Sequence, residues 1–485
     1  MDNQHAMPKG YGFRGWMLIL YQALCYVGYV MTTSYVVNIL SAYCPNGTMD
    51  TTLLTMIGTA LTFVVTYFII APRIGKIRNQ KAVSLLLGII TLVLAAGEIL
   101  IFPTTAAGGL NPIWIIFFCL THVIAPTWAN SMTTILIGNW FPRKKGTVMG
   151  IVTIAYPITS AILLSVFQAT HAGQMAMGKP LITANIIAWA PFFAAVIIGL
   201  IICAIFVKTY PEDCGCYRDN DKSFTKEMAD AMLQRELEAR KRSVWKRSKI
   251  WACAQWYLGS IPTTLIVTSS VAFMVQIIPA LASFAMQGHF TQFVVPGFFF
   301  MSNPISAVLF LMGIFAIIGS YVLGLLDTRF GTKPAIIITA ISIIIMGVLG
   351  MFNNPWTLFV ATMLLGVYMG AGSNFGFSLL VRYWRPEDFP AVYTGAPPIN
   401  SVVNAVLPYI FAALATTAWG YHATFAFVGV LGVISLIMEA AFSPKKLADY
   451  DNKLRVAAGL EADNVLYDRI GMEKRLANAK KDKLA

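Results

Sequence analysis

The chain has 485 residues, of which 57% are hydrophobic and only 12% are charged, with a mean hydropathy of +0.68 and a formal net charge of +13. A water-soluble domain carries about 25% charged residues, so this composition excludes the soluble class. It indicates a membrane protein with many spans.

Apolar runs close to the roughly 20 residues that cross a bilayer as a helix alternate with polar segments along the whole chain. Pro262 and Pro279 interrupt the seventh run. The sequence therefore predicts an all-α integral membrane protein with twelve transmembrane helices, at 17–40, 52–71, 83–102, 113–138, 147–168, 184–207, 260–284, 304–326, 334–352, 356–381, 391–416 and 421–443.

The basic residues predict the orientation, because Lys and Arg resist translocation and stay in the cytoplasm. With twelve spans, every Lys and Arg except Lys179 falls in a terminal segment or in an alternate loop on the same side. We therefore expect a multi-pass protein of the cell (plasma or inner) membrane with both termini in the cytoplasm. The positive charge follows this topology, and it does not indicate a nucleic-acid partner.

A long polar segment between the sixth and seventh spans divides the chain. The predicted parts are a cytoplasmic N-terminus (1–16), a six-helix bundle (17–207), a cytoplasmic linker with an amphipathic helix (208–259), a second six-helix bundle (260–443) and a cytoplasmic tail (444–485).

Two short matches indicate an internal repeat. The Arg-x-Gly of Arg73 and Gly75 recurs at Arg329 and Gly331, 256 positions later, and the Trp-x-Pro of 140–142 recurs at 384–386. In each half, the first motif follows the second span and the second motif follows the fourth span. The sequence thus predicts two pseudo-symmetric halves.

The loop "GLLDTRFGTK" (324–333) resembles the loop signature of the major facilitator superfamily. Within that superfamily, "NWFPRKKG" (139–146) and "YPEDCGC" (210–216) resemble the oxalate:formate antiporter family. The resemblance implies a fold of two six-helix bundles and solute transport by alternating access. Two departures stand out, since Pro72 replaces the usual Asp in the first half and Asp327 lies one place early.

Cytoplasmic loop residues can bridge helices in one rigid-body state and separate in the other, which biases an alternating-access equilibrium. The basic cluster around Arg143 can equally well be interpreted as one that only fixes the orientation of the chain in the membrane. The predicted gating residues are Arg73, Gly75, Arg143, Asp327, Arg329 and Gly331.

Polar side chains within the spans are costly in lipid, so they are the candidates for solute contact near the midplane. Hydrogen bonds between helices are the alternative role for each. The candidates are Gln22, Tyr26, Tyr29, Trp128, Asn130, Tyr156, Gln276, Tyr368, Asn374, Asn400 and Asn404.

The spans 304–326 and 391–416 contain no Lys or Arg, whereas oxalate-type members of the resembled family are expected to pair their dianion with a cation in each. An uncharged cavity favours a small neutral, amphipathic or monoanionic organic solute. Dicarboxylate or formate antiport is the alternative.

Glu98 and His122 are the candidates for proton coupling, because they stand at similar depth in neighbouring spans and a desolvated carboxyl group can carry a proton. A carboxylate near the outer interface and a hydrogen-bonded core histidine are the alternatives.

No phosphate loop, catalytic triad or metal-ligand pattern occurs, so no enzyme, cofactor or metal site is predicted. The expected function is secondary active transport of a small organic solute, coupled to protons or to exchange, by a functional monomer in the lipid bilayer. The alternative is a transporter-like sensor that binds solute without flux.

Overall fold

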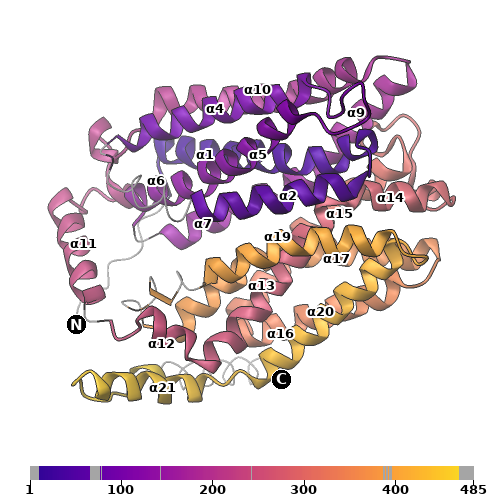
Figure 1. The fold of residues 1–485 in the computed structure, drawn as a ribbon. Coiled ribbons are helices and arrows are strands. Elements are labelled where there is room, and N and C mark those ends of the chain that lie inside the picture. The colour runs from indigo at the N-terminus through magenta and orange to yellow at the C-terminus, as the bar shows by residue number, and fades with distance from the viewer. Residues whose placement is uncertain are drawn as a thin grey trace. The chain divides into compact units, whose positions relative to one another are not determined.

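The structure, a computed structural model, describes residues 10–65, 77, 79–142, 144–241, 243–385, 388, 391–392 and 396–468. Helices dominate these residues (Figure 1), which form no strand beyond an isolated bridge between Thr104 and Leu110. The prediction of an all-α fold is confirmed. The predicted gating residues Arg73, Gly75 and Arg143 lie outside the described residues.

The chain forms two compact units, and the first comprises Met1–Met232 and Met274–Gly313. Its elements are α1 (Phe13–Asn38), η1 (Leu40–Tyr43), α2 (Thr48–Thr62), α4 (Gln80–Leu100), α5 (Pro112–Pro126), η3 (Thr127–Met132), α6 (Thr133–Trp140), α7 (Lys145–Thr153), α8 (Ala155–Pro157), η4 (Ile158–Leu163), α9 (Leu164–Ala176), α10 (Leu181–Phe206), η5 (Pro211–Cys214), η6 (Arg218–Asn220), α14 (Ile277–Met286), η7 (Thr291–Phe293) and η8 (Phe299–Met301). The elements η3 and η4 are π-helical.

The second unit comprises Leu233–Phe273 and Ile314–Ala485. Its elements are α12 (Arg247–Trp251), α13 (Ala254–Val275), α16 (Thr332–Gly350), α17 (Pro355–Tyr383), α19 (Ala396–Ala415), α20 (Tyr421–Ala441) and α21 (Pro444–Ala457). The division between the units falls inside α11 (Lys226–Lys241) and α15 (Pro304–Phe330) and near the end of α13. The predicted domain limits stay predictions.

Every predicted span coincides with a described helix or a series of short helices. Nine described helices are long and apolar enough to cross a membrane, and α17, bent by 41° between Gly370 and Asn374, makes a tenth. The fifth predicted span is broken by η4, and α19, in place of the eleventh, is short. The seventh predicted span is divided at Gln276, where the helix breaks between α13 and α14.

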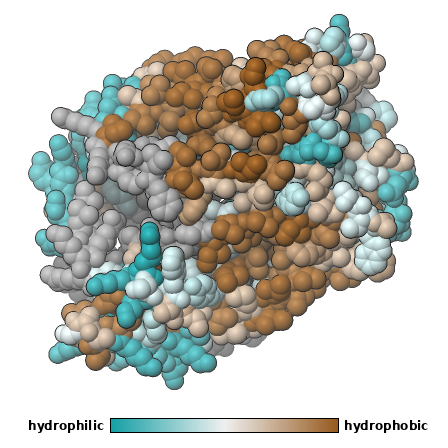
Figure 2. Space-filling model, viewed as in Figure 1, coloured by the Kyte–Doolittle hydropathy of each residue, from teal (hydrophilic) through white to brown (hydrophobic). Residues whose placement is uncertain are grey.

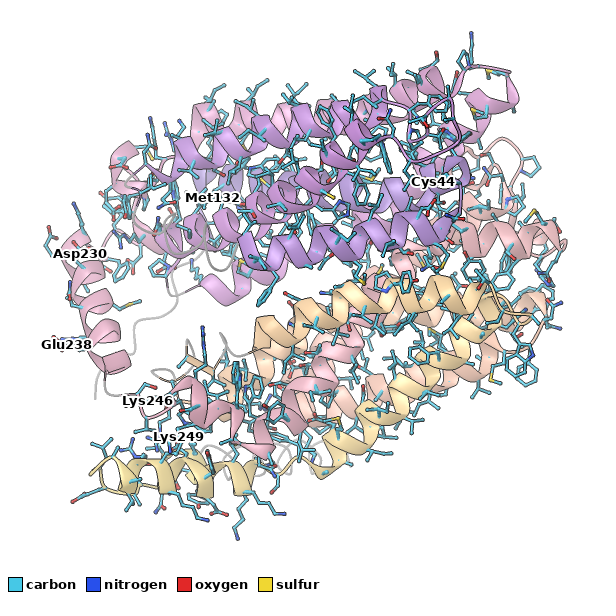
Figure 3. The ribbon with its side chains drawn as sticks, in the orientation of Figure 1. Cys44, Met132, Asp230, Glu238, Lys246 and Lys249 are labelled. Atoms are coloured by element: carbon cyan, nitrogen blue, oxygen red, sulfur yellow. The ribbon has the colours of Figure 1, made fainter. Side chains whose placement is uncertain are left out.

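The helices are apolar on the outside and partly polar within. Large apolar side chains, such as Leu86, Ile89 and Val93 on α4 and Ile201 on α10, are exposed. Figure 2 shows hydrophobic residues gathered along the helices and hydrophilic residues toward their ends. Met132 lies among the helices of the first unit (Figure 3), where its side chain is fully buried. This pattern suits a surface that lipid surrounds.

Candidate functional site

The α1 helix is the centre of the polar residues of the first unit. It packs against η3, α8 and α14. The predicted solute-contact residues on these elements are Trp128 and Asn130 on η3, Tyr156 on α8 and Gln276 at the start of α14, and α1 itself carries Gln22, Tyr26 and Tyr29. The fold thus gathers around one helix the segments that carry seven of the eleven predicted residues.

These residues differ in their exposure. Gln22 and Gln276 are buried, and Tyr26 is buried in edge-to-face contact with Tyr29, with ring centroids 6.5 Å apart. Asn130, by contrast, is exposed. Gln22, Tyr26, Tyr29 and Gln276 therefore form the polar set that lies inside the first unit.

Trp128 belongs to a buried chain of hydrogen bonds. Its indole Nε1 donates to the Tyr21 hydroxyl at 3.1 Å, and that hydroxyl lies 2.7 Å from the Ser84 Oγ. A Cβ on Gly28 or Gly88 would lie within 3.0 Å of the Trp128 ring, so glycines on α1 and α4 make its space. This chain, in which Tyr21 and Ser84 were not predicted, joins α1, α4 and η3.

We predict that Tyr21→Phe destabilises the detergent-solubilised protein by about 1 kcal/mol, because it leaves the Trp128 indole and the Ser84 hydroxyl without their shared partner. Thermal unfolding measures the change. Tyr43→Phe, on the partly exposed η1, is the control and should leave unfolding unchanged. Equal unfolding temperatures for the two variants would contradict the assigned role of the Tyr21 hydroxyl.

A proline precedes each of the π-helical segments η3 and η4. Pro126 ends α5 before η3, and Pro157 ends α8 before η4. Proline has no N–H for the carbonyl four residues earlier, which for Pro126 is that of His122. The Thr62 hydroxyl of α2 shares its one hydrogen between this carbonyl, at 2.5 Å, and the Gly58 carbonyl of its own helix, at 2.8 Å. A side chain from another helix therefore helps to satisfy the backbone group that Pro126 frees.

Glu98 is a buried acid between α4 and α5, with 1% of its surface exposed. The Trp114 indole donates to its backbone carbonyl at 3.3 Å. Its carboxyl Oε1 is buried and has no hydrogen-bond partner among the described residues. The Thr121 hydroxyl of α5 donates its one hydrogen to the Phe117 carbonyl of its own helix, at 2.8 Å.

The bonds of His122 define its tautomer. Its Nδ1 lies 3.0 Å from the Phe118 carbonyl, which only accepts, so Nδ1 carries the hydrogen in the neutral ring. The other nitrogen, Nε2, is then an acceptor, and it has no hydrogen-bond partner among the described residues. Glu98 and His122 thus place two buried titratable side chains on the packed helices α4 and α5.

In the second unit, the predicted polar residues lie on α17 and α19. The Thr264 hydroxyl of α13 donates a short hydrogen bond to the Asn400 amide oxygen. Tyr368 is fully buried, and its hydroxyl has no hydrogen-bond partner among the described residues. Asn404 is half-buried and Asn374 exposed. Asn400 therefore faces the polar side of α13.

At the turn between α15 and α16 in the second unit, Asp327 joins three helices. Its Oδ1 accepts from the Thr332 hydroxyl at 2.6 Å and lies 3.7 Å from the Arg382 guanidinium, which also donates to the Asp327 carbonyl at 3.1 Å. Gly331, with φ of 102°, turns the chain from α15 into α16 beside Arg382. Arg329 is exposed. Arg382, which was not predicted, is the cation that holds Asp327.

We predict that Arg382→Gln slows solute exchange about fivefold, the equivalent of about 1 kcal/mol for a partly buried ion pair, whereas Arg329→Gln leaves it near the wild-type rate. Counterflow of solute in proteoliposomes compares the two variants. A larger effect of Arg329→Gln than of Arg382→Gln would instead support gating by Arg329.

Residues 264–460 match the family model of the Major Facilitator Superfamily. No curated protein matches the sequence. Among solved structures, the xylose transporter XylE from E. coli aligns over 90% of this chain and 98% of its own, with 12% identity and a TM-score of 0.61.

A D-xylose-proton symporter aligns over 90% of this chain and 98% of its own, with 15% identity and a TM-score of 0.60. A bacterial homologue of the human drug peptide transporters PepT1 and PepT2 aligns over 89% and 98%, with 16% identity and a TM-score of 0.59. At these identities the likeness shows only that the chain shares its fold with these transporters.

Proposed function

We propose that the protein is a secondary active transporter of the major facilitator superfamily that moves a small organic solute by alternating access. One observation carries the proposal: the fold matches that of solved transporters over about nine-tenths of the chain. A fold alone does not define a function, so the polar residues buried inside apolar spans are the second support.

The proposed solute is neutral, amphipathic or monoanionic. The polar groups inside the units are amides, hydroxyls and aromatic rings, with Gln22 and Tyr26 in the first unit and Tyr368 and Asn400 in the second. Such groups hold an organic molecule by apolar contact and a few hydrogen bonds. Dicarboxylate or formate antiport, as in the resembled antiporter family, stays the alternative, and it requires a cation that 304–326 and 391–416 lack.

The proposed coupling ion is the proton. Glu98 and His122 support this choice, because both are buried titratable groups and the bond of His122 Nδ1 leaves its Nε2 as an acceptor. A D-xylose-proton symporter is among the proteins of similar fold. Exchange without protons is the alternative mode.

Counterflow in proteoliposomes tests the proposal. A thermal-shift screen of organic acids, steroids and amino-acid derivatives first identifies a compound that stabilises the purified protein. We expect vesicles loaded with this compound to take up its labelled form faster than protein-free vesicles do. Stabilisation without any counterflow would overturn transport and support a sensor that binds solute without flux.

A further inference from the structure

The turn that follows Trp140 in the first unit holds the beginning of the linker and the N-terminal segment. The Trp140 indole donates to the Lys208 carbonyl at 2.9 Å. The Lys144 ammonium is buried and donates to the carbonyls of Gly10, at 2.7 Å, and Asp219, at 3.0 Å. It also lies 5.2 Å from the centre of the Tyr11 ring.

The turn that follows Trp384 in the second unit holds the end of the linker. Trp384 packs against Trp245, with ring centroids 6.0 Å apart. The Ser243 hydroxyl donates to the Asp388 Oδ1 at 2.5 Å. Lys144 and Asp388 are 244 positions apart, as are Trp140 and Trp384, so the same repeat position binds the linker in both units with opposite charge.

The charges of the linker agree only in part with this pairing. Residues 208–222 carry four acids and three bases, and 240–249 carries six bases and no acid. The first turn is basic, with three bases at 143–145, whereas the second carries two bases, Arg382 and Arg385, beside the acids Glu387 and Asp388. The contacts of Lys144 and Asp388, rather than net charge, therefore assign each end of the linker to its turn.

The C-terminal segment fastens the second turn through one guanidinium. Arg385, 5% exposed, donates through Nε to the Asp451 Oδ2 at 3.0 Å and through Nη1 to the Asp463 Oδ2 at 2.9 Å. The other oxygen of Asp451 accepts from the Trp245 indole at 2.8 Å. Asp451 thus joins the turn, the tail and the end of the linker.

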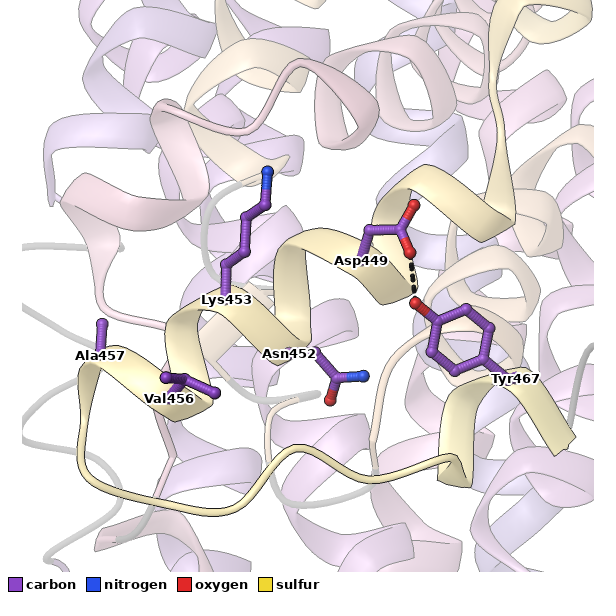
Figure 4. Close-up of a pocket in the computed structure, with 6 residues that line it drawn as sticks. All are labelled: Asp449, Asn452, Lys453, Val456, Ala457 and Tyr467. Atoms are coloured by element: carbon purple, nitrogen blue, oxygen red, sulfur yellow. Dashed lines mark hydrogen bonds between the residues drawn. The ribbon is translucent and has the colours of Figure 1, made fainter.

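The tail is folded back on itself around these acids. Asn452 and Asp463 exchange two hydrogen bonds, and Arg455 lies 3.2 Å from the Asp463 carboxylate. Tyr467 donates to Asp449 across an open pocket of about 700 Å³ (Figure 4). The hydrogen bond from Arg385 lowers the pKa of Asp463 below its ordinary value, so the carboxylate is charged at neutral pH.

We propose that the two repeat-related turns are matched docking sites, each for one end of the linker and one terminal segment, and that Asp451 and Asp463 clip the linker end to the second unit. Along the chain, α11 lies between the two docked ends of the linker. Asp230 and Glu238 on this helix are exposed and point away from it (Figure 3). Release of the clip lengthens the free linker and slows transport, a consequence that rests on the proposed function.

Limited trypsin digestion of the full-length protein in detergent tests the docking. We expect Arg385→Gln to increase cleavage about tenfold both in 445–455 and in 240–249, because Asp451 serves both segments. Asp463→Asn, at a more exposed acid, should increase cleavage in the tail alone. Arg455→Gln, which removes a surface partner of Asp463 but leaves Arg385 in place, is the matched control. Because it also removes one trypsin site, all variants are compared after Lys445, Lys446 and Lys453 in the tail, where this control should change little.

Unchanged cleavage in both Arg385→Gln and Asp463→Asn would overturn the docking. Counterflow of the same variants tests the consequence for transport, and we expect a several-fold slower rate for Arg385→Gln. Increased cleavage with unchanged counterflow overturns the control of transport by the clip. Loss of counterflow in the wild type and in all variants instead overturns the proposed function, so the two failures are distinguishable.

Discussion

Replacing Glu98 by Gln should abolish proton-driven accumulation of solute while counterflow persists. The substitution keeps the size and shape of the side chain but removes its titration. Because the amide of Gln is isosteric with the carboxyl group and Glu98 Oε1 has no hydrogen-bond partner among the described residues, the packing around α4 and α5 should survive. Accumulation should fall to the level of passive equilibration.

The measurement is uptake into proteoliposomes after a pH jump, with counterflow measured on the same vesicles. Glu439→Gln is the matched control, since Glu439 is also a buried glutamate but lies near the end of α20 in the second unit. His122→Ala should also abolish accumulation, because it removes the acceptor Nε2. Accumulation at the wild-type level in both Glu98→Gln and His122→Ala would refute the assignment of the coupling site.

The second large effect concerns stability, at Gly319 of α15. A Cβ at this position would lie 2.3 Å from the Val367 carbonyl oxygen and 2.4 Å from its Cα. The backbone of α17 cannot avoid this contact by rotating a side chain, so Gly319→Ala forces the two helices apart. We expect destabilisation of about 3 kcal/mol or more, the upper end of the cost of overpacking.

Gly324→Ala on the same helix is the control. No atom lies within 4 Å of its added Cβ, and alanine favours a helix over glycine by about 0.5–1 kcal/mol, so this variant should be as stable as the wild type or more so. Thermal unfolding in detergent compares the two. Equal stability of both variants would show that α15 and α17 are not packed this closely.

The spans were predictable from sequence because apolar length alone determines them. The direction in which each side chain points was harder to predict from sequence. Pro126 is followed by a π-helical turn, which carries more residues than an α-helical one and rotates every later side chain away from its α-helical projection. Asn130, predicted to contact solute, lies beyond this turn and is exposed.

The cytoplasmic contacts show a second limit. Asp327 and Arg329 stand two residues apart on α15, so their side chains point about 200° apart and do not share a neighbour. The true partner, Arg382, lies 55 positions along the chain, and only the packing of α15 against α17 brings it there. The hydrogen bonds of Tyr21 with Ser84 and Trp128 are likewise distant in sequence and carry no local pattern.

The bond from Thr62 to the His122 carbonyl has a consequence for the course of the fourth span. That span continues from Pro112 to Trp140 in spite of Pro126, and α2 offers the His122 carbonyl a hydrogen that Pro126 lacks. A backbone hydrogen bond from Thr127 to the Ile124 carbonyl also crosses the proline. A threonine on one helix therefore helps its proline-containing neighbour to keep its course, so that His122 and Trp128, on either side of Pro126, belong to one continuous span.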